Sequence, residues 1–220
     1  MASPRCPSAK GRPWVFRAEF FGAFPAVDLA LLARGWHVGH CALSDLYGCP
    51  EAVSGMKAFH DGAVSRFGLS PRAAMFGFSR GGLYAVNYAL AHPQDVESLY
   101  LDAPVLDIRS WPGGKGIGTG DEGCWRECLA CYGLTEETAR SFDRNPLDRA
   151  EELAALNIPV ILVAGGADKT VPYGENGLPF AARFRRAGGD IQVILKPDCD
   201  HHPHSLADPA PITSFLTRND

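Results

Sequence analysis

The pentapeptide at 77–81, Gly-Phe-Ser-Arg-Gly, constrains the fold more than any other part of this chain. It follows a short apolar run at 73–76 and precedes a stretch with apolar residues at helical spacing, which ends at His92-Pro93. A serine between a buried strand and a buried helix needs small neighbours, because the turn is tight and its backbone φ is unusual. The two glycines supply that room. The pattern therefore predicts a nucleophile elbow with Ser79 at its tip.

Two further polar residues each follow a strand-like segment. The apolar run 160–164 leads to Asp168, and the run 191–195 leads to His201. Ser79, Asp168 and His201 all lie just beyond the carboxyl end of a predicted strand, where parallel α/β sheets carry their sites. The chain order serine, aspartate, histidine is that of the α/β-hydrolase triad, so the sequence predicts a Ser-His-Asp catalytic triad.

From residue 14 to about 217 the chain resembles the α/β-hydrolase superfamily. The resemblance is carried by the pentapeptide, by Ala-Asp-Lys-Thr-Val-Pro at 167–172 and by His-His-Pro-His at 201–204. The set is similar to bacterial serine esterases of the prolyl-oligopeptidase-like type, several of which act on acylated carbohydrates. The carbohydrate part rests on the histidine loop and on the glycine-rich loop at 111–114. The resemblance implies a carboxylic-ester hydrolase without a cofactor. A serine peptidase of the prolyl-oligopeptidase type and a catalytically silent binding protein with this fold are the alternatives.

The choice of the base rests on the histidine loop. The segment 197–201 takes the place of the family's Pro-Gly-x-Gly-His, which favours His201. Asp198 and Asp200 stand where that pattern has glycines, and His202 is the alternative base.

The choice of the acid is between two strand ends. Asp168 follows the strand at 160–164 and is the expected partner of the histidine. Asp102 follows the preceding strand, whose end can also reach the histidine, and is the alternative.

The oxyanion hole needs two N–H donors. The resemblance places one at the backbone of Arg80, the residue after the nucleophile. The loop after the strand at 14–17 supplies the second, from Ala18 or Glu19.

Substrate contacts are expected from Arg17, Trp111 and Tyr173. Arg17 and Arg80 suit a polar alcohol and the aromatic rings suit a sugar. Such arginines are more often structural and paired with a carboxylate such as Glu19, and core packing explains the aromatic residues at least as well. The insertion at 102–158 is glycine-rich and charged and lacks a long apolar helix that could line a lipid tunnel. We therefore expect short acyl groups such as acetyl, carried by a small-molecule or oligosaccharide ester.

A metal site is the competing interpretation of the Asp and His cluster at 198–204. The residue types are suitable ligands, but adjacent ligands on one bent loop rarely complete a tetrahedral shell alone. We expect no metal. Cys124, Cys128 and Cys131 match the spacing of radical-SAM iron–sulfur ligands, yet i, i+4, i+7 spacing favours one packed helix face.

Composition excludes several other classes. The net charge of −4 gives no reason to expect nucleic acid as a partner, and the apolar runs are far shorter than the roughly 20 residues of a membrane span. Seven cysteines without regular spacing, and an N-terminus without an apolar signal region, indicate a reduced, cytoplasmic location. No feature indicates an oligomeric state.

Strands and helices alternate along the chain, which predicts an α/β-hydrolase fold with a mostly parallel sheet and helices on both faces. We expect an N-terminal extension at 1–13 and one domain at 14–220, with a cap insertion at about 102–158. The family usually opens with two more strands, so a shortened sheet of about six is expected. The predicted strands lie at 14–17, 36–43, 73–76, 98–101, 160–164 and 191–195, and the main helices at 27–33, 50–67, 83–90 and near 212–216.

Overall fold

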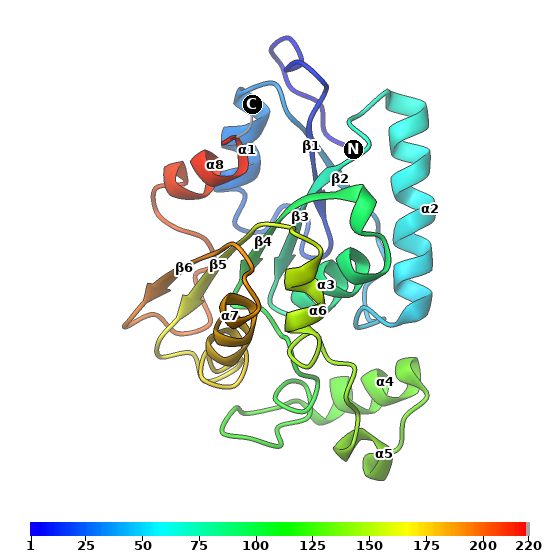
Figure 1. Cartoon of the computed structure of the whole chain (residues 1–220), viewed down its shortest axis with the longest axis vertical. Helices are drawn as coiled ribbons and strands as arrows, with labels where there is room; N and C mark the ends of the chain where they lie inside the picture. Colours follow the sequence, from blue (N-terminus) through cyan, green and yellow to red (C-terminus); the bar gives the residue numbers. More distant parts are fainter. Residues whose placement is uncertain (219–220) are drawn as a thin grey trace.

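Six short apolar segments pair into one sheet. The computed structural model describes residues 1–218, and every strand pairing in it is parallel, with the strand order β2-β1-β3-β4-β5-β6 (Figure 1). The strands are β1 (Trp14–Arg17), β2 (His37–His40), β3 (Ala73–Phe78), β4 (Val96–Asp102), β5 (Val160–Gly165) and β6 (Ile191–Lys196). The expected sheet of six strands is confirmed.

Alternate residues of the buried strands face two separate cores. One core joins strand residues such as Val15 and Tyr100 to the helices α1 (Ala26–Ala33) and α8 (Ala210–Leu216). The other joins residues such as Phe16 and Leu99 to the helices of the opposite face, which are α2 (Pro50–Phe67), α3 (Gly81–Ala91), α6 (Ala150–Ala155) and α7 (Gly177–Arg186). Helices therefore cover both faces, because the period of two along a strand directs apolar side chains to both sides.

Local signals set the boundaries of the longest helix. The helix α2 has the predicted bounds, with Pro50 at its first position and Gly68 in the left-handed conformation after its end. The strand β2 is shorter than the predicted 36–43. It pairs on one side with the four residues of β1, and a strand ends where its partner ends.

The N-terminal segment lies against the edge of the sheet. It lacks helices and strands, as expected, but Ala2 pairs with Val38 of β2 through two backbone hydrogen bonds of 2.7 and 3.0 Å. This contact covers part of an edge strand whose N–H and C=O groups would otherwise be exposed.

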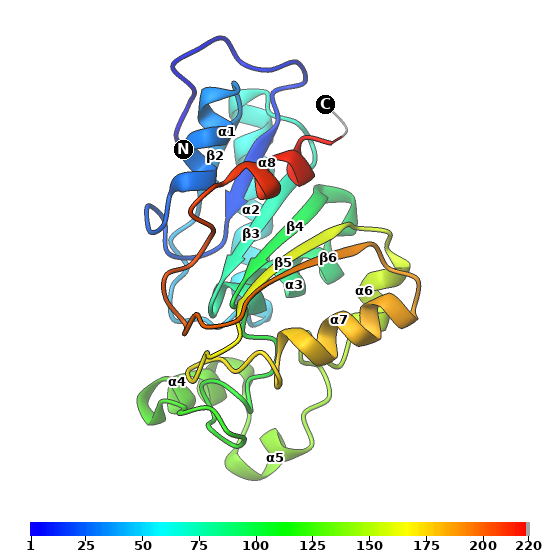
Figure 2. The same cartoon turned by 90° about the vertical axis from the view of Figure 1, so that its left-hand side faces the viewer.

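The insertion after β4 divides between two places. Its helices α4 (Glu122–Tyr132) and α5 (Glu136–Arg140) lie beyond the carboxyl ends of the strands, whereas α6 packs beside α7 in the helical layer (Figures 1 and 2). The α4 cysteines pack as small apolar residues, since Cys128 is buried and Cys124 and Cys131 are half-buried in one cluster with Tyr47.

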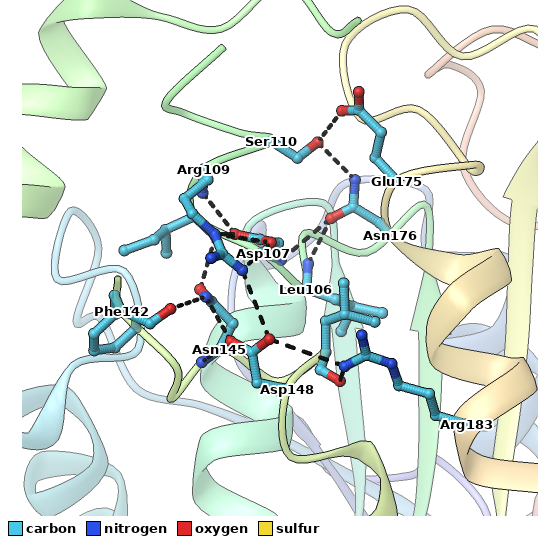
Figure 3. A network of polar contacts seen from close by, with 12 residues as sticks. Leu106, Asp107, Arg109, Ser110, Phe142, Asn145, Asp148, Glu175, Asn176 and Arg183 are labelled. Carbon is cyan, nitrogen blue, oxygen red and sulfur yellow. Dashed lines mark hydrogen bonds and ion pairs between the residues drawn. The ribbon is translucent and has the colours of Figure 1, made fainter. Parts of the chain in front are cut away.

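A polar network fastens this insertion to the start of α7 (Figure 3). The Asn176 side-chain oxygen accepts from the backbone N–H of Leu106, at 2.9 Å, and its amide donates to Ser110 Oγ, also at 2.9 Å. Asn145 Oδ1 accepts from the Ile108 N–H at 3.0 Å. The loop that follows β4 is therefore tied to the segment that follows Asp168.

Among residues 1–218, no helix combines the length and the apolar character that a membrane crossing requires.

Candidate active site

The turn between β3 and α3 holds Ser79 in a strained backbone conformation, with φ of 48°. Its N–H donates to Asp102 O at 2.9 Å, and its carbonyl accepts from Val105 N at 2.9 Å. A Cβ on Gly77 would lie 2.8 Å from Gly81 O, and one on Gly81 would lie 3.3 Å from Glu19 Cβ. Both glycines are therefore required by close packing around the serine. The positive end of α3 points toward this turn.

Three predicted residues meet at this turn. Ser79 Oγ lies 2.9 Å from His201 Nε2, and His201 Nδ1 lies 2.7 Å from Asp168 Oδ2. A carboxylate only accepts hydrogen bonds, so Nδ1 carries the proton and the Nε2 lone pair faces the serine hydroxyl. Asp168 is held in turn by the N–H groups of Thr170 and Val171, at 2.9 and 2.8 Å from Oδ1.

Asp200, which departs from the family's glycine pattern, connects the two loops of the site. Its Oδ1 accepts from Lys169 N at 3.1 Å and from His201 N at 2.7 Å, and these backbone donors lower the pKa of the Asp200 carboxyl. Gly166 allows the approach, because a Cβ there would lie 2.4 Å from Pro197 O. The histidine loop is therefore held without the glycines of the family pattern.

Asp102, the alternative acid, contacts a different histidine. Its Oδ1 lies 2.9 Å from His204 Nδ1, and its Oδ2 accepts from Tyr100 OH at 2.6 Å and from Ser205 N at 2.8 Å. Asp102 and His204 are both buried. This second Asp–His pair was not predicted. His202, the alternative base, is exposed and stacks on Phe24 with ring centroids 5.6 Å apart.

Two of the three candidate oxyanion donors are backbone N–H groups without an acceptor in the described part of the chain. The Ala18 N–H donates to Phe76 O at 3.0 Å, so the expectation that it is a free donor is wrong. Within residues 1–218 the backbone N–H groups of Arg80 and Glu19 have no protein acceptor, and both lie beside the serine turn. The Arg80 side chain pairs with Glu19 Oε2 and with Asp45 Oδ1, each at 2.8 Å. Burial opposes the charge on Arg80, but the carboxylates of Glu19 and Asp45 outweigh burial and raise the pKa of the guanidinium.

Arg17 has a structural role, which corrects the expectation that it binds substrate. It is 1% exposed, donates to Asp28 Oδ2 at 2.6 Å and lies 4.2 Å from the centroid of the Phe78 ring. Burial lowers the pKa of Arg17 and Asp28 partly offsets this effect. The charge of Arg17 is therefore paired with Asp28 inside the protein and is buried away from solvent.

The expected aromatic contacts are placed differently. Trp111 is half-buried, 6.3 Å from the Tyr47 ring, and Tyr47 lies under the Arg80 guanidinium. The Tyr173 ring packs against Gly177, where a Cβ would come within 2.8 Å of it, so it supports the start of α7. Its contact with substrate stays a prediction.

Two exposed aromatic residues of the loop after β1 were missed. Phe20 and Phe21 directly follow Glu19 and are 39% and 52% exposed. The Arg80 guanidinium lies over the Phe20 ring, with its central carbon 5.5 Å from the ring centroid. Their position in the sequence, just after the predicted oxyanion loop, was the available signal.

A model of the prolyl oligopeptidase family matches residues 54–218. A curated relative, acylamino-acid-releasing enzyme 2 of Oryza sativa subsp. japonica, is 26% identical over 140 residues, which are 59% of this chain and 17% of that protein. The chain thus spans less than a fifth of that relative.

Solved structures share the fold at low identity. A puromycin-hydrolyzing peptidase of Mycobacterium tuberculosis superposes with a TM-score of 0.67 and 18% identity, over 96% of this chain and 33% of that one. Est1E from Butyrivibrio proteoclasticus superposes with a TM-score of 0.64 and 17% identity, over 99% of this chain and 91% of that one. Together with the parallel sheet, these likenesses confirm the expected α/β-hydrolase fold.

Proposed function

Because the chain belongs to the prolyl oligopeptidase family and has the α/β-hydrolase fold, we propose that it hydrolyses carboxylic esters through Ser79, His201 and Asp168. The observation that carries the proposal is the continuous path from Ser79 Oγ to His201 and on to Asp168, through contacts of 2.9 and 2.7 Å. A serine hydroxyl is a weak nucleophile until an adjacent base accepts its proton, and this path supplies the base.

The reaction follows from the geometry. Ser79 Oγ forms a bond to the acyl carbon while its proton moves to His201 Nε2, and Asp168 stabilises the imidazolium. The carbonyl oxygen gains negative charge and accepts from the backbone N–H groups of Arg80 and Glu19. His201 then protonates the leaving alkoxide. Water repeats these steps on the acyl-enzyme, releasing the acid and restoring Ser79.

A fluorophosphonate probe tests whether the site works. We expect covalent labelling of the peptide that contains Ser79 and none in the Ser79→Ala variant, as read by mass spectrometry. A wild-type protein that stays unlabelled would favour the catalytically silent binding protein instead.

Peptide hydrolysis is the second candidate, because the matched family and the rice relative are named for peptidase activity. Esters have the better leaving group, so we expect kcat/KM for an acetyl nitrophenyl ester to exceed that for acyl-amino-acid and dipeptide anilides. The reverse ranking would assign the chain to the peptidases.

For the substrate we propose a short acyl group on a polar or carbohydrate alcohol. Support comes from the exposed ring of Phe20, from Trp111 on the loop beyond the strands, and from the Arg80 guanidinium beside the serine turn. We expect kcat/KM to decrease from acetyl through butyryl to octanoyl nitrophenyl esters. Acetate release from acetylated xylo-oligosaccharides tests the alcohol, and a maximum at octanoyl would contradict the short acyl group.

A further inference from the structure

Three imidazoles converge beside the nucleophile. His201, His202 and His204 lie in mutual edge-to-face contact, with ring centroids 4.9 to 5.0 Å apart. One ring nitrogen from each falls within 4.8 Å of the other two. Ligand nitrogens around a tetrahedral ion at about 2.0–2.1 Å stand somewhat closer than this, so a bound ion would draw the three rings together.

The hydrogen bonds leave the right nitrogens available. Nδ1 of His201 is held by Asp168, and Nδ1 of His204 is held by Asp102, at 2.7 and 2.9 Å. Both carboxylates are buried, and each fixes the tautomer that leaves Nε2 with its lone pair. A histidine held by a carboxylate at one nitrogen and open at the other is the usual arrangement of histidine metal ligands.

The third imidazole makes no competing hydrogen bond. Within residues 1–218 the His202 ring has no hydrogen-bond partner and stacks on Phe24, with ring centroids 5.6 Å apart. Its ring nitrogens are therefore open to a metal ion.

We propose that His201, His202 and His204 bind a divalent transition-metal ion such as Zn²⁺, and that this ion inhibits the enzyme reversibly. The inhibitory half rests on the proposed function. A metal–nitrogen bond uses the same Nε2 lone pair of His201 that must accept the Ser79 proton, so the two uses exclude each other. Water completes the fourth ligand position.

A second group, His60, Asp61 and Asp95, is a weaker candidate. The ammonium of Lys57 already contacts Asp61 and lies 3.5 Å from Asp95, so these carboxylates have a cation. His60 Nε2 is hydrogen-bonded to the carbonyl oxygen of Pro71 at 3.0 Å. Asp61 is exposed, which makes Asp61→Asn a matched control.

Binding is measured first without catalysis. In the Ser79→Ala protein, which keeps all three imidazoles, we expect Co²⁺ to give the visible absorption of a tetrahedral nitrogen site. Adding His202→Asn should weaken Co²⁺ and Zn²⁺ affinity at least tenfold, whereas adding Asp61→Asn should leave it unchanged. A loss of metal affinity in the Asp61 variant instead would overturn the proposed site. An intense thiolate charge-transfer band would do the same, because it would place the Co²⁺ ion at the cysteines.

Inhibition is measured next on an acetyl nitrophenyl ester. We expect Zn²⁺ to inhibit the wild-type protein at concentrations where Mg²⁺ has no effect, and EDTA to restore the rate. The Zn²⁺ concentration that gives half-inhibition should rise at least tenfold in His202→Asn and stay constant in Asp61→Asn. Zinc binding without inhibition would overturn the inhibitory half. If the wild-type protein hydrolyses no ester, the proposed function and the inhibitory half both fall, and the cobalt spectrum alone decides the site.

Discussion

Two Asp–His pairs hold the loop at 201–204, and only one of them contacts a nucleophile. Asp168 follows β5 and pairs with His201 at 2.7 Å, whereas Asp102 is the last residue of β4 and pairs with His204 at 2.9 Å. His201 presents its other nitrogen to Ser79 Oγ. The Asp102 carboxylate also binds Tyr100 and Ser205, so it fastens the loop to the sheet.

The comparison teaches that residue type and pair distance do not define a catalytic dyad. What the free imidazole nitrogen faces decides the role. The Asp102 pair is buried, and burial followed by the charge of Asp102 raises the pKa of Tyr100 well above its ordinary value, which keeps its hydroxyl a donor.

The largest effect is expected at the nucleophile. Ser79→Ala should lower kcat on an activated ester by a factor on the order of 10⁶, because the covalent path is lost while binding remains. Stopped assays with acetyl nitrophenyl ester measure this, and circular dichroism checks the fold. A rate equal to that of the wild type would mean that Ser79 is not the nucleophile and that neither Asp–His pair activates it.

His201→Ala should be about as damaging as Ser79→Ala, and the double variant should be little worse, because the triad acts as a unit. The same ester assay on the three proteins measures this. Additive losses would show that His201 and Ser79 act independently, and a greater loss in His202→Ala would move the base to His202.

Asp168→Asn separates the two pairs most directly. It should lower kcat by a factor on the order of 10⁴, because the amide favours the wrong tautomer of His201. KM and the melting temperature should change little. An active Asp168→Asn protein beside an inactive Asp102→Asn protein would exchange the two roles.

Asp102→Asn should act on stability. An asparagine keeps one acceptor oxygen for the donors of His204, Tyr100 and Ser205, so a buried donor loses its partner at a cost of about 1–3 kcal/mol. Urea unfolding measures the loss, and kcat should fall less than about tenfold. An unchanged unfolding midpoint would contradict the fastening role.

The smallest effect is expected at His202. Its ring is exposed and makes no hydrogen bond to residues 1–218, so His202→Asn should keep kcat/KM within about threefold of the wild-type value. Metal-free buffer with EDTA is needed for this assay. A much larger loss would assign His202 a part in the reaction.

The sequence predicted the local elements and the three residues that we propose as the reacting groups. The helix 50–67 has a proline at its start and a glycine at its end, and each signal acts over one turn. Ser79, Asp168 and His201 could be named because the elbow pattern and the strand ends are features of short segments.

Only the tertiary structure decided which charged groups form ion pairs and which backbone groups are hydrogen-bonded. Arg17 pairs with Asp28 and Arg80 with Glu19, although the sequence allowed Glu19 to either arginine. The Ala18 N–H donates to Phe76 O of the sheet, which leaves the Glu19 N–H as the second oxyanion donor that we propose. Hydrogen bonds and ion pairs form across a few ångströms between segments that lie far apart in sequence, and no local pattern encodes that distance.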